Sequence, residues 1–258
     1  MPFLKLPPAL PLFLEPHLPF PRRAYRLESG PDAGRCIHFL DSLVPGGPGD
    51  AVSQGRMAAR PVLLVHGNPT WSFLWRKVIA ALPGVRCVAP DLLGLGLSSK
   101  PERIADHSLE RHGGAVAELV GALDLREVVL VGQDWGGPIV AQVGVLQPGR
   151  IGGLVLANTA VLVPKHPRGT AFHRFARVPG LSDVVFRGFG FPLGSLGRLQ
   201  GDPQSLRGIP ERAYRFPLRG WRERAAPLAL ARRGVARSRG ARRPAARAVA
   251  QGLDAEHG

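Results

Sequence analysis

The stretch that most constrains the fold is residues 127–137, which read Glu-Val-Val-Leu-Val-Gly-Gln-Asp-Trp-Gly-Gly. Its first half is apolar and β-branched, as in a buried strand. Gly132, Gly136 and Gly137 then bracket one carboxylate, Asp134. A turn that presents a nucleophile between a strand and a helix needs such small residues, because it is strained and the helix packs close to the strand. The stretch therefore predicts strand, sharp turn and helix. The alternative is an ordinary glycine-rich turn in which Asp134 caps the helix.

Apolar strands and amphipathic helices alternate along most of the chain, which predicts an α/β fold with a mostly parallel sheet covered by helices on both faces. In such sheets, ligands bind beyond the carboxyl ends of the strands. His66, Asn68, Asp91 and Asp134 all fall at predicted strand ends. Strands are expected at 24–28, 36–41, 61–65, 85–89, 127–131 and 151–157, helices at 71–82, 106–123 and 136–146, and a long loop at 44–60.

The composition fits one α/β domain with an insertion. The chain has 258 residues, of which 45% are hydrophobic, and a formal charge of +15 that reflects many arginines after residue 205. Its two cysteines, Cys36 and Cys87, form neither a disulfide framework nor a metal-binding spacing. This cysteine usage favours a reducing cytoplasm.

The first 22 residues are apolar but contain seven prolines, which would break a signal-peptide helix. We expect residues 1–22 to form an extended Pro-rich arm. No later run reaches the length of apolar sequence that a membrane span needs.

Three stretches resemble the haloalkane dehalogenases of the α/β-hydrolase superfamily. They are HGNPTWSFLWR at 66–76, DLLGLGLSSKP at 91–101 and GQDWGG at 132–137. Epoxide hydrolases are the nearest alternative, since they share the Asp-Trp-Gly-Gly turn. Asn68 and Gln133 favour the dehalogenases over them. The resemblance implies an α/β-hydrolase core at 23–159 followed by a helical cap at 160–230.

The chemistry of dehalogenation suits these residue types. A carboxylate is already charged at pH 7, so Asp134 can displace a halide without a base and form an alkyl ester. The leaving halide needs hydrogen-bond donors, which the indole of Trp135 and the amide of Asn68 offer. The resemblance implies that Asn68 and Trp135 bind the halide and that their backbone N–H groups hold the later oxyanion. Water is the second substrate, and neither metal nor cofactor is implied.

Each of these residues also has a structural interpretation. Asn68 could cap the following helix, and Trp135 could fill the core. His66 is expected to hydrogen-bond the backbone, and Asp91 to shape its loop. In the cap, several apolar side chains would line a substrate pocket or, individually, pack in the core: Phe172, Phe175, Val184, Val185, Phe186, Phe189 and Phe191.

The resemblance stops near Arg232, where an Arg-rich tail replaces the expected strands. Residues 231–258 offer only His257 as a base, and Asn158 stands where some subgroups have an acid. A reading-frame shift that removes the C-terminal strands, or a basic arm, would explain the tail. The composition favours the first over binding of nucleic acid, and in either case predicts disorder. The loss of two strands would leave 151–157 as an open, aggregation-prone edge.

The predicted function is therefore hydrolysis of small haloalkanes to alcohol and halide, with Asp134 as nucleophile and a general base still to be found. Two alternatives stay open. One is epoxide hydrolysis, and the other is a truncated, non-catalytic hydrolase-like protein with a basic tail. The sequence does not give the oligomeric state.

Overall fold

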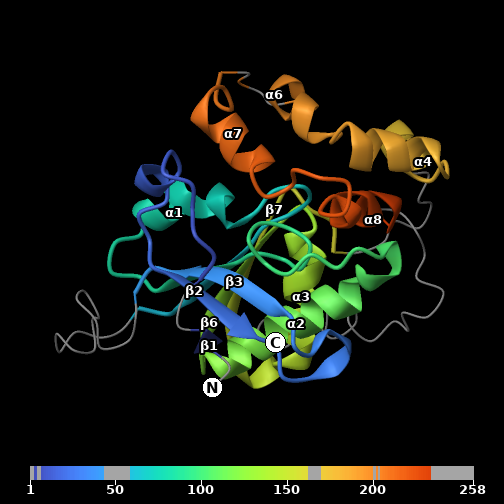
Figure 1. Cartoon of the computed structure of the whole chain (residues 1–258). Helices are drawn as coiled ribbons and strands as arrows, with labels where there is room; N and C mark the ends of the chain where they lie inside the picture. The colour runs from blue at the N-terminus through green and yellow to red at the C-terminus, as the bar shows by residue number, and fades with distance from the viewer. Residues whose placement is uncertain are drawn as a thin grey trace.

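The computed structural model describes residues 3–4, 7–43, 59–161, 170–199, 202 and 204–233. Its centre is a seven-stranded sheet in the order β1-β2-β3-β5-β4-β6-β7 (Figure 1). The last four strands in this order run parallel, while β1, β2 and β3 form an antiparallel edge. The predicted mostly parallel sheet is therefore confirmed. The strands are β1 Phe3–Leu4, β2 Arg22–Arg26, β3 Cys36–Asp41, β4 Val62–Val65, β5 Cys87–Pro90, β6 Val128–Gln133 and β7 Ile151–Ala157.

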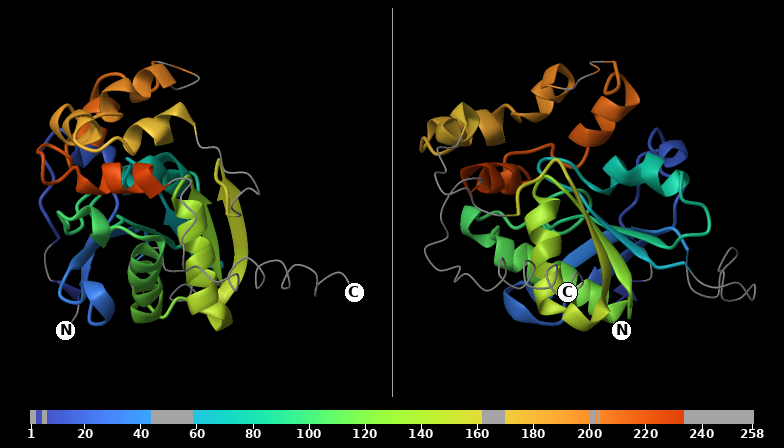
Figure 2. Two further views of the ribbon diagram at one scale, coloured as in Figure 1. Left: turned by 90° about the vertical axis from the view of Figure 1, so that its right-hand side faces the viewer. Right: turned by 180° about the vertical axis from the view of Figure 1, so that it is seen from behind.

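Helices α2 (Leu109–Ala122) and α3 (Gly136–Leu146) lie side by side, and α3 packs against the sheet (Figures 1 and 2). Helix α2 begins later than predicted because the Ser108 side chain caps it, accepting a hydrogen bond from the Arg111 N–H at 3.2 Å. The helix expected at 71–82 is a 3₁₀ turn, η3 (Ser72–Trp75), followed by the short helix α1 (Arg76–Ala80).

The N-terminal segment differs from the extended arm expected at 1–22. Strand β1 pairs with β2, and a 3₁₀ turn, η1, forms at Glu15–His17. Leu10, Leu14 and Leu18 recur at intervals of four and enter the main core. The prolines do exclude a long helix, but burial of the leucines holds the segment against the domain.

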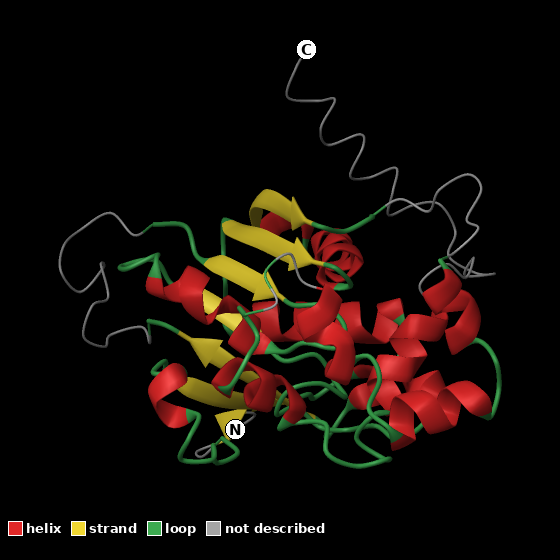
Figure 3. Cartoon of the chain, turned by 90° about the horizontal axis from the view of Figure 1, so that it is seen from above, coloured by secondary structure: helices red, strands yellow, loops and turns green. Residues whose placement is uncertain are grey.

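The segment after β7 is helical in its described parts. In Figure 1 these helices, coloured orange to red, lie above the strands, and Figure 3 shows the chain from that side. The last of them, α8, crosses the boundary expected between 230 and 231, and residues 234–258 lie outside the described part of the chain. Most of the loop expected at 44–60 lies outside it too. The elements are α4 Ala171–Ala176, α5 Leu181–Asp183, the π-helical turn η6 Val184–Gly188, η7 Leu193–Ser195, α6 Leu196–Leu199, α7 Ile209–Arg215 and α8 Ala225–Arg233.

The phenylalanines of this helical segment form a small core of their own. The rings of Phe186 and Phe191 meet edge to face at 5.3 Å between centroids, and Phe172 and Phe175 join them beside Leu228. These four phenylalanines therefore pack in a core, as the structural interpretation predicted, and do not line a pocket in the described part of the chain. Phe189, in contrast, is 82% exposed.

Strand β7 is an apolar edge of the sheet. Among the described strands it pairs only with β6, and Figure 2 shows it at the outer side of the molecule. Leu154, Val155 and Leu156 are 39%, 49% and 44% exposed. The open edge expected from the sequence is present in the described part of the chain, and its tendency to aggregate stays a prediction.

The described helices also bear on membrane association. None of them combines the length and apolar character that crossing a bilayer requires.

Candidate active site

Asp134 lies on the turn between β6 and α3, with a positive φ of 52°. A left-handed conformation is rare outside glycine and marks a strained turn, as the nucleophile interpretation predicts. The Thr159 hydroxyl donates a hydrogen bond to the Asp134 carbonyl oxygen at 2.5 Å. The residue before α3 is Trp135, and no side chain caps this helix. The alternative in which Asp134 is a helix cap is therefore wrong.

Glycines let three backbone segments approach Asp134. A Cβ on Gly136 would overlap the carbonyl oxygen of Val65 at the end of β4, and one on Gly67 would overlap the Asp134 side chain. A Cβ on Gly132 would lie 2.6 Å from the carbonyl oxygen of Gly136. The glycine spacing read from the sequence thus reflects close packing of β4, β6 and α3 around one carboxylate.

The Gly136→Ala variant is expected to lose about 3 kcal/mol or more of unfolding free energy, because the Val65 carbonyl belongs to a central strand and cannot move aside. Gly144→Ala in the same helix is the matched control. Its Cβ would have only ordinary contact, 3.9 Å from Leu130 Cδ1, so this variant should gain about 0.5–1 kcal/mol. Urea unfolding of both variants measures the difference. Equal stabilities would contradict the close approach at Gly136.

Asn68 contacts both the carboxylate and the last described helix. Its backbone N–H donates to Asp134 Oδ1 at 2.7 Å, and its side-chain Nδ2 donates to the Pro227 carbonyl oxygen of α8 at 3.0 Å. Its Oδ1 is buried and has no partner among the described residues. The residue before η3 is Trp71, so Asn68 does not cap the next helical turn.

Trp135 is partly buried, and its side chain packs against the main core. This packing matches the structural interpretation of Trp135, while its backbone N–H contributes to lowering the pKa of Asp134. Asn68 therefore places a backbone donor on the predicted nucleophile, and the Trp135 N–H favours its charged form. The halide-binding role of their side chains stays a prediction.

The charge state of Asp134 reflects opposing effects. Burial raises the pKa of its carboxyl above the ordinary value, while the backbone N–H groups of Asn68 and Trp135 and the charge of His173 lower it. The carboxylate is thus partly removed from water, which favours attack on carbon, yet two fixed donors stabilise its charge.

His66 and Asp91 hold loops together, as expected. The His66 ring is buried, with Nδ1 2.8 Å from the Gly67 carbonyl and Nε2 accepting from the Leu92 N–H at 3.0 Å. Asp91 accepts from the Ser72 N–H at 2.7 Å and lies 2.8 Å from His38 Nδ1. Burial opposes ionisation of Asp91, but the charge and hydrogen bond of His38, the charge of His66 and the Leu97 N–H outweigh it and lower the pKa of Asp91 to about 2. Both residues are structural.

The sequence did not single out His173, on α4, which when protonated lowers the pKa of Asp134. A histidine in a cap helix carries no sequence motif, and the sequence offered only His257 as a base after residue 231. The candidate found there, His257, lies outside the described residues. Asn158, considered at the acid position, is exposed at the end of β7 with a φ of 46°.

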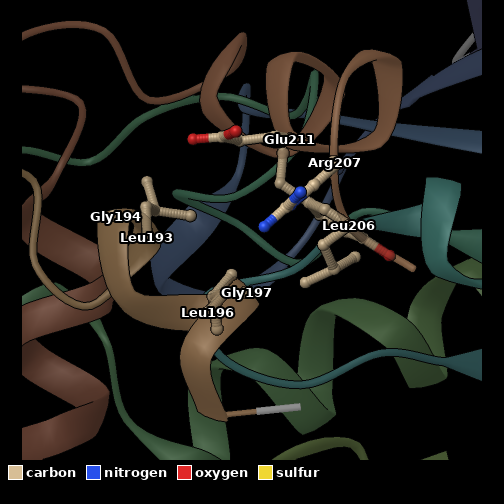
Figure 4. Close-up of a pocket in the computed structure, with 8 residues that line it drawn as sticks. Leu193, Gly194, Leu196, Gly197, Leu206, Arg207 and Glu211 are labelled. Carbon is tan, nitrogen blue, oxygen red and sulfur yellow. The ribbon is translucent and has the colours of Figure 1, made fainter. Parts of the chain in front are cut away.

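A cavity of about 220 Å³ lies between α6 and α7 (Figure 4). Asp134 does not line it, so this cavity is separate from the candidate nucleophile. Within the described ranges, no three His, Cys, Asp or Glu side chains are grouped so as to hold a metal. The cavity is lined by Leu193, Gly194, Leu196, Gly197, Leu206, Arg207, Glu211 and Tyr214.

The known proteins that are similar to this chain are hydrolases. A family model described as the alpha/beta hydrolase fold matches residues 60–197. The chain is 42% identical over 128 residues to Haloalkane dehalogenase 2 of Mycobacterium tuberculosis (strain ATCC 25618 / H37Rv), covering 49% of this chain and 44% of that protein. It is 37% identical over 165 residues to Haloalkane dehalogenase of Mycolicibacterium paratuberculosis (strain ATCC BAA-968 / K-10), covering 63% and 51%.

Among solved structures, the crystal structure of the haloalkane dehalogenase DatA from Agrobacterium tumefaciens C58 is similar, with a TM-score of 0.62 and 26% identity. The match covers 82% of this chain and 67% of that one. The chain spans about half the length of the curated relatives that it matches.

Proposed function

The chain belongs to the α/β hydrolase fold family, and from that premise we propose that it hydrolyses small haloalkanes to an alcohol and a halide ion. The observation that carries this proposal is the strained turn of Asp134, where the Asn68 N–H holds one carboxylate oxygen at 2.7 Å. A carboxylate so placed is a nucleophile for saturated carbon, since it needs no base to become charged.

In the first step, the free oxygen of Asp134 attacks the halogen-bearing carbon, and the halide leaves with the bonding electrons. The Asn68 amide and the Trp135 indole are the donors proposed for the halide. The Asn68 amide now donates to Pro227, so halide binding requires this contact to open.

In the second step, water attacks Cγ of the Asp134 ester and places a negative charge on Oδ1. The backbone N–H groups of Asn68 and Trp135 are already directed at this carboxylate and would stabilise that charge. Collapse of the tetrahedral intermediate releases the alcohol and restores the carboxylate.

The same nucleophile could open an epoxide, which makes epoxide hydrolysis the second candidate. The similar proteins named as haloalkane dehalogenases favour the first. The substrate partners proposed are a haloalkane and water, and the free thiols of Cys36 and Cys87 fit the reducing cytoplasm that we propose as the location.

Intact-mass measurement after incubation with a small bromoalkane tests the proposal, with free bromide measured in parallel. We expect one alkyl group per chain, bromide release, or both. Turnover of an epoxide of the same chain length with no reaction of the bromoalkane would support the second candidate. Folded protein that forms no adduct and releases no bromide would contradict both enzymatic functions.

A further inference from the structure

The helical segment that follows β7 exposes several large apolar side chains to solvent. Phe189 is 82% exposed, and Trp221 is 45% exposed. Four of these residues follow one another from the end of α4 to the end of η6, and Trp221 lies in the loop before α8. We call the set the apolar patch, and it consists of Val178, Leu181, Val184, Phe189 and Trp221.

The two parts of the apolar patch meet at η6. Arg187 Nε donates to the Trp221 carbonyl oxygen at 3.0 Å, and the Arg187 guanidinium lies over the Trp221 ring, 4.8 Å from its centroid. A Cβ on Gly188 would lie 3.8 Å from the Trp221 ring and 3.9 Å from Val184 Cγ1. Trp221 and Val184 are therefore neighbours, and residues distant in the sequence form one surface.

The opposite face of this segment packs against the protein. Phe172, Phe175 and Phe186 form the small core with Leu228, and both α4 and η6 contact α8. Figures 1 and 2 show α8 between α4 and the sheet. The segment is thus already held in place by its inner face, and the exposed side chains of the apolar patch add nothing to that packing.

The extent of the apolar patch indicates an interaction surface. Its two aromatic rings alone leave on the order of 200 Å² of apolar surface in water. Single exposed apolar residues are ordinary on soluble proteins, whereas contiguous ones with a polar rim mark sites of interaction with proteins or membranes.

Arginines surround the apolar patch. Residues 171–197 and 216–224 contain six arginines and two carboxylates. Asp183 pairs with an arginine of α8 at 2.6 Å, and Glu223 accepts the Gly220 N–H at 2.5 Å, so both carboxylates have partners within the protein. The rim therefore presents positive charge. The six arginines are Arg174, Arg177, Arg187, Arg219, Arg222 and Arg224.

We propose that the apolar patch docks on the surface of a lipid bilayer that contains anionic phospholipids. Phe and Trp side chains favour the boundary between headgroups and acyl chains, where Phe189 and Trp221 would insert. Arginine can lay its stem along apolar surface while its guanidinium binds phosphate. Arg187, stacked on Trp221, has this arrangement in the structure.

The charge of the rim favours a bilayer over a second copy of the chain. Two copies that met through the apolar patch would bring their arginines together, and like charges across an interface oppose association. A fluid lipid surface also needs no matching cavity for the protruding Phe189 ring. The inference goes beyond the reaction proposed for Asp134 and does not depend on it.

Fluorescence of the full chain with vesicles tests the proposal through Trp221. Vesicles of phosphatidylcholine mixed with phosphatidylglycerol, with a nitroxide label on the acyl chains, should quench Trp221. Vesicles of phosphatidylcholine alone should bind far more weakly. Trp71 and Trp75 are buried, so Trp221→Phe should lose most of the quenching and still bind. Residues 234–258 contain no tryptophan, so binding through their arginines would not produce this quenching.

Phe189→Ser is expected to bind the mixed vesicles about tenfold more weakly than the wild type, because one aromatic ring no longer enters the apolar layer. Leu12→Ser is the matched control, since Leu12 is 84% exposed but lies in the N-terminal segment. This control should bind as the wild type does. Added salt should weaken binding of the wild type by screening the arginines.

The other outcomes would overturn the proposal. Equal vesicle binding by the wild type, Phe189→Ser and Leu12→Ser, with no quenching of Trp221, would assign the binding to other basic parts of the chain. If the wild type does not bind the mixed vesicles, the apolar patch is not a membrane surface. A concentration-dependent dimer that Phe189→Ser abolishes would then show that a second copy covers it.

Discussion

Asp134→Asn is expected to form no alkyl adduct with a small bromoalkane and to release no bromide above the uncatalysed rate. An amide has no negative charge with which to displace a halide, whereas the carboxylate is held ready by two backbone donors. The fold should persist, because asparagine tolerates the left-handed φ of 52° better than other non-glycine residues do. Intact mass and bromide release measure the loss.

Asp124→Asn is the matched control. Asp124 also has a positive φ, 45°, but it is exposed and pairs with Arg150 at 2.6 Å on the surface. This variant should react as the wild type does. If Asp134→Asn were still alkylated once per chain, the nucleophile would be a different residue, and peptide mapping of the adduct would locate it.

The parts of the fold that sequence predicted are those set by local pattern. The apolar run before Gly132 forms β6. The glycines that follow predicted the strained turn correctly, because the close backbone contacts there leave no room for a Cβ. Asn68 could be placed near Asp134 for a similar reason. Both follow parallel strands, β4 and β6, that are neighbours in the sheet and end at the same edge.

What the sequence did not predict depends on tertiary contact. In the sequence, Leu14 and Leu18 belong to a proline-rich segment that indicates an exposed arm. In the structure, the main core buries both side chains. The bond from Asn68 to Pro227 joins residues 159 positions apart, and no periodicity encodes it. The packing of α4 on α8 likewise joins segments far apart in the sequence, and no local pattern predicted it.

Acidification is expected to destabilise the protein steeply, chiefly through His112 on α2. Its ring is 1% exposed, and neither ring nitrogen has a hydrogen-bond partner in the part of the chain that the structure describes. Burial, followed by the charges of His107, His66 and two arginines, lowers the pKa of His112 to about 3. An imidazole in such a place resists protonation as long as the fold persists.

The direction of this pH effect follows from the difference in proton uptake between the folded and unfolded protein. Unfolded His112 takes up a proton near pH 6.5, whereas the folded form does so only near pH 3, so stability falls as pH drops through this window. The loss is about 1.4 kcal/mol per pH unit, or about 5 kcal/mol across the window, which rivals the whole stability of a typical domain. The lowered pKa of His66 adds to this loss, that of Asp91 adds to it only below about pH 3.8, and the raised pKa of Asp134 opposes it.

His112→Leu should flatten this pH dependence, because leucine fills a similar volume and leaves no buried polar group without a partner. The same change at the exposed His17 should keep the wild-type slope. Urea unfolding at pH 7, 6, 5 and 4 gives the slope for each protein. If the unfolding free energy of His112→Leu depends on pH as steeply as that of the wild type, the acid sensitivity arises from the other buried groups. A slope that is only partly reduced would show that both His112 and its stacked neighbour His107 contribute to the acid sensitivity. Burial lowers the pKa of His107 as well.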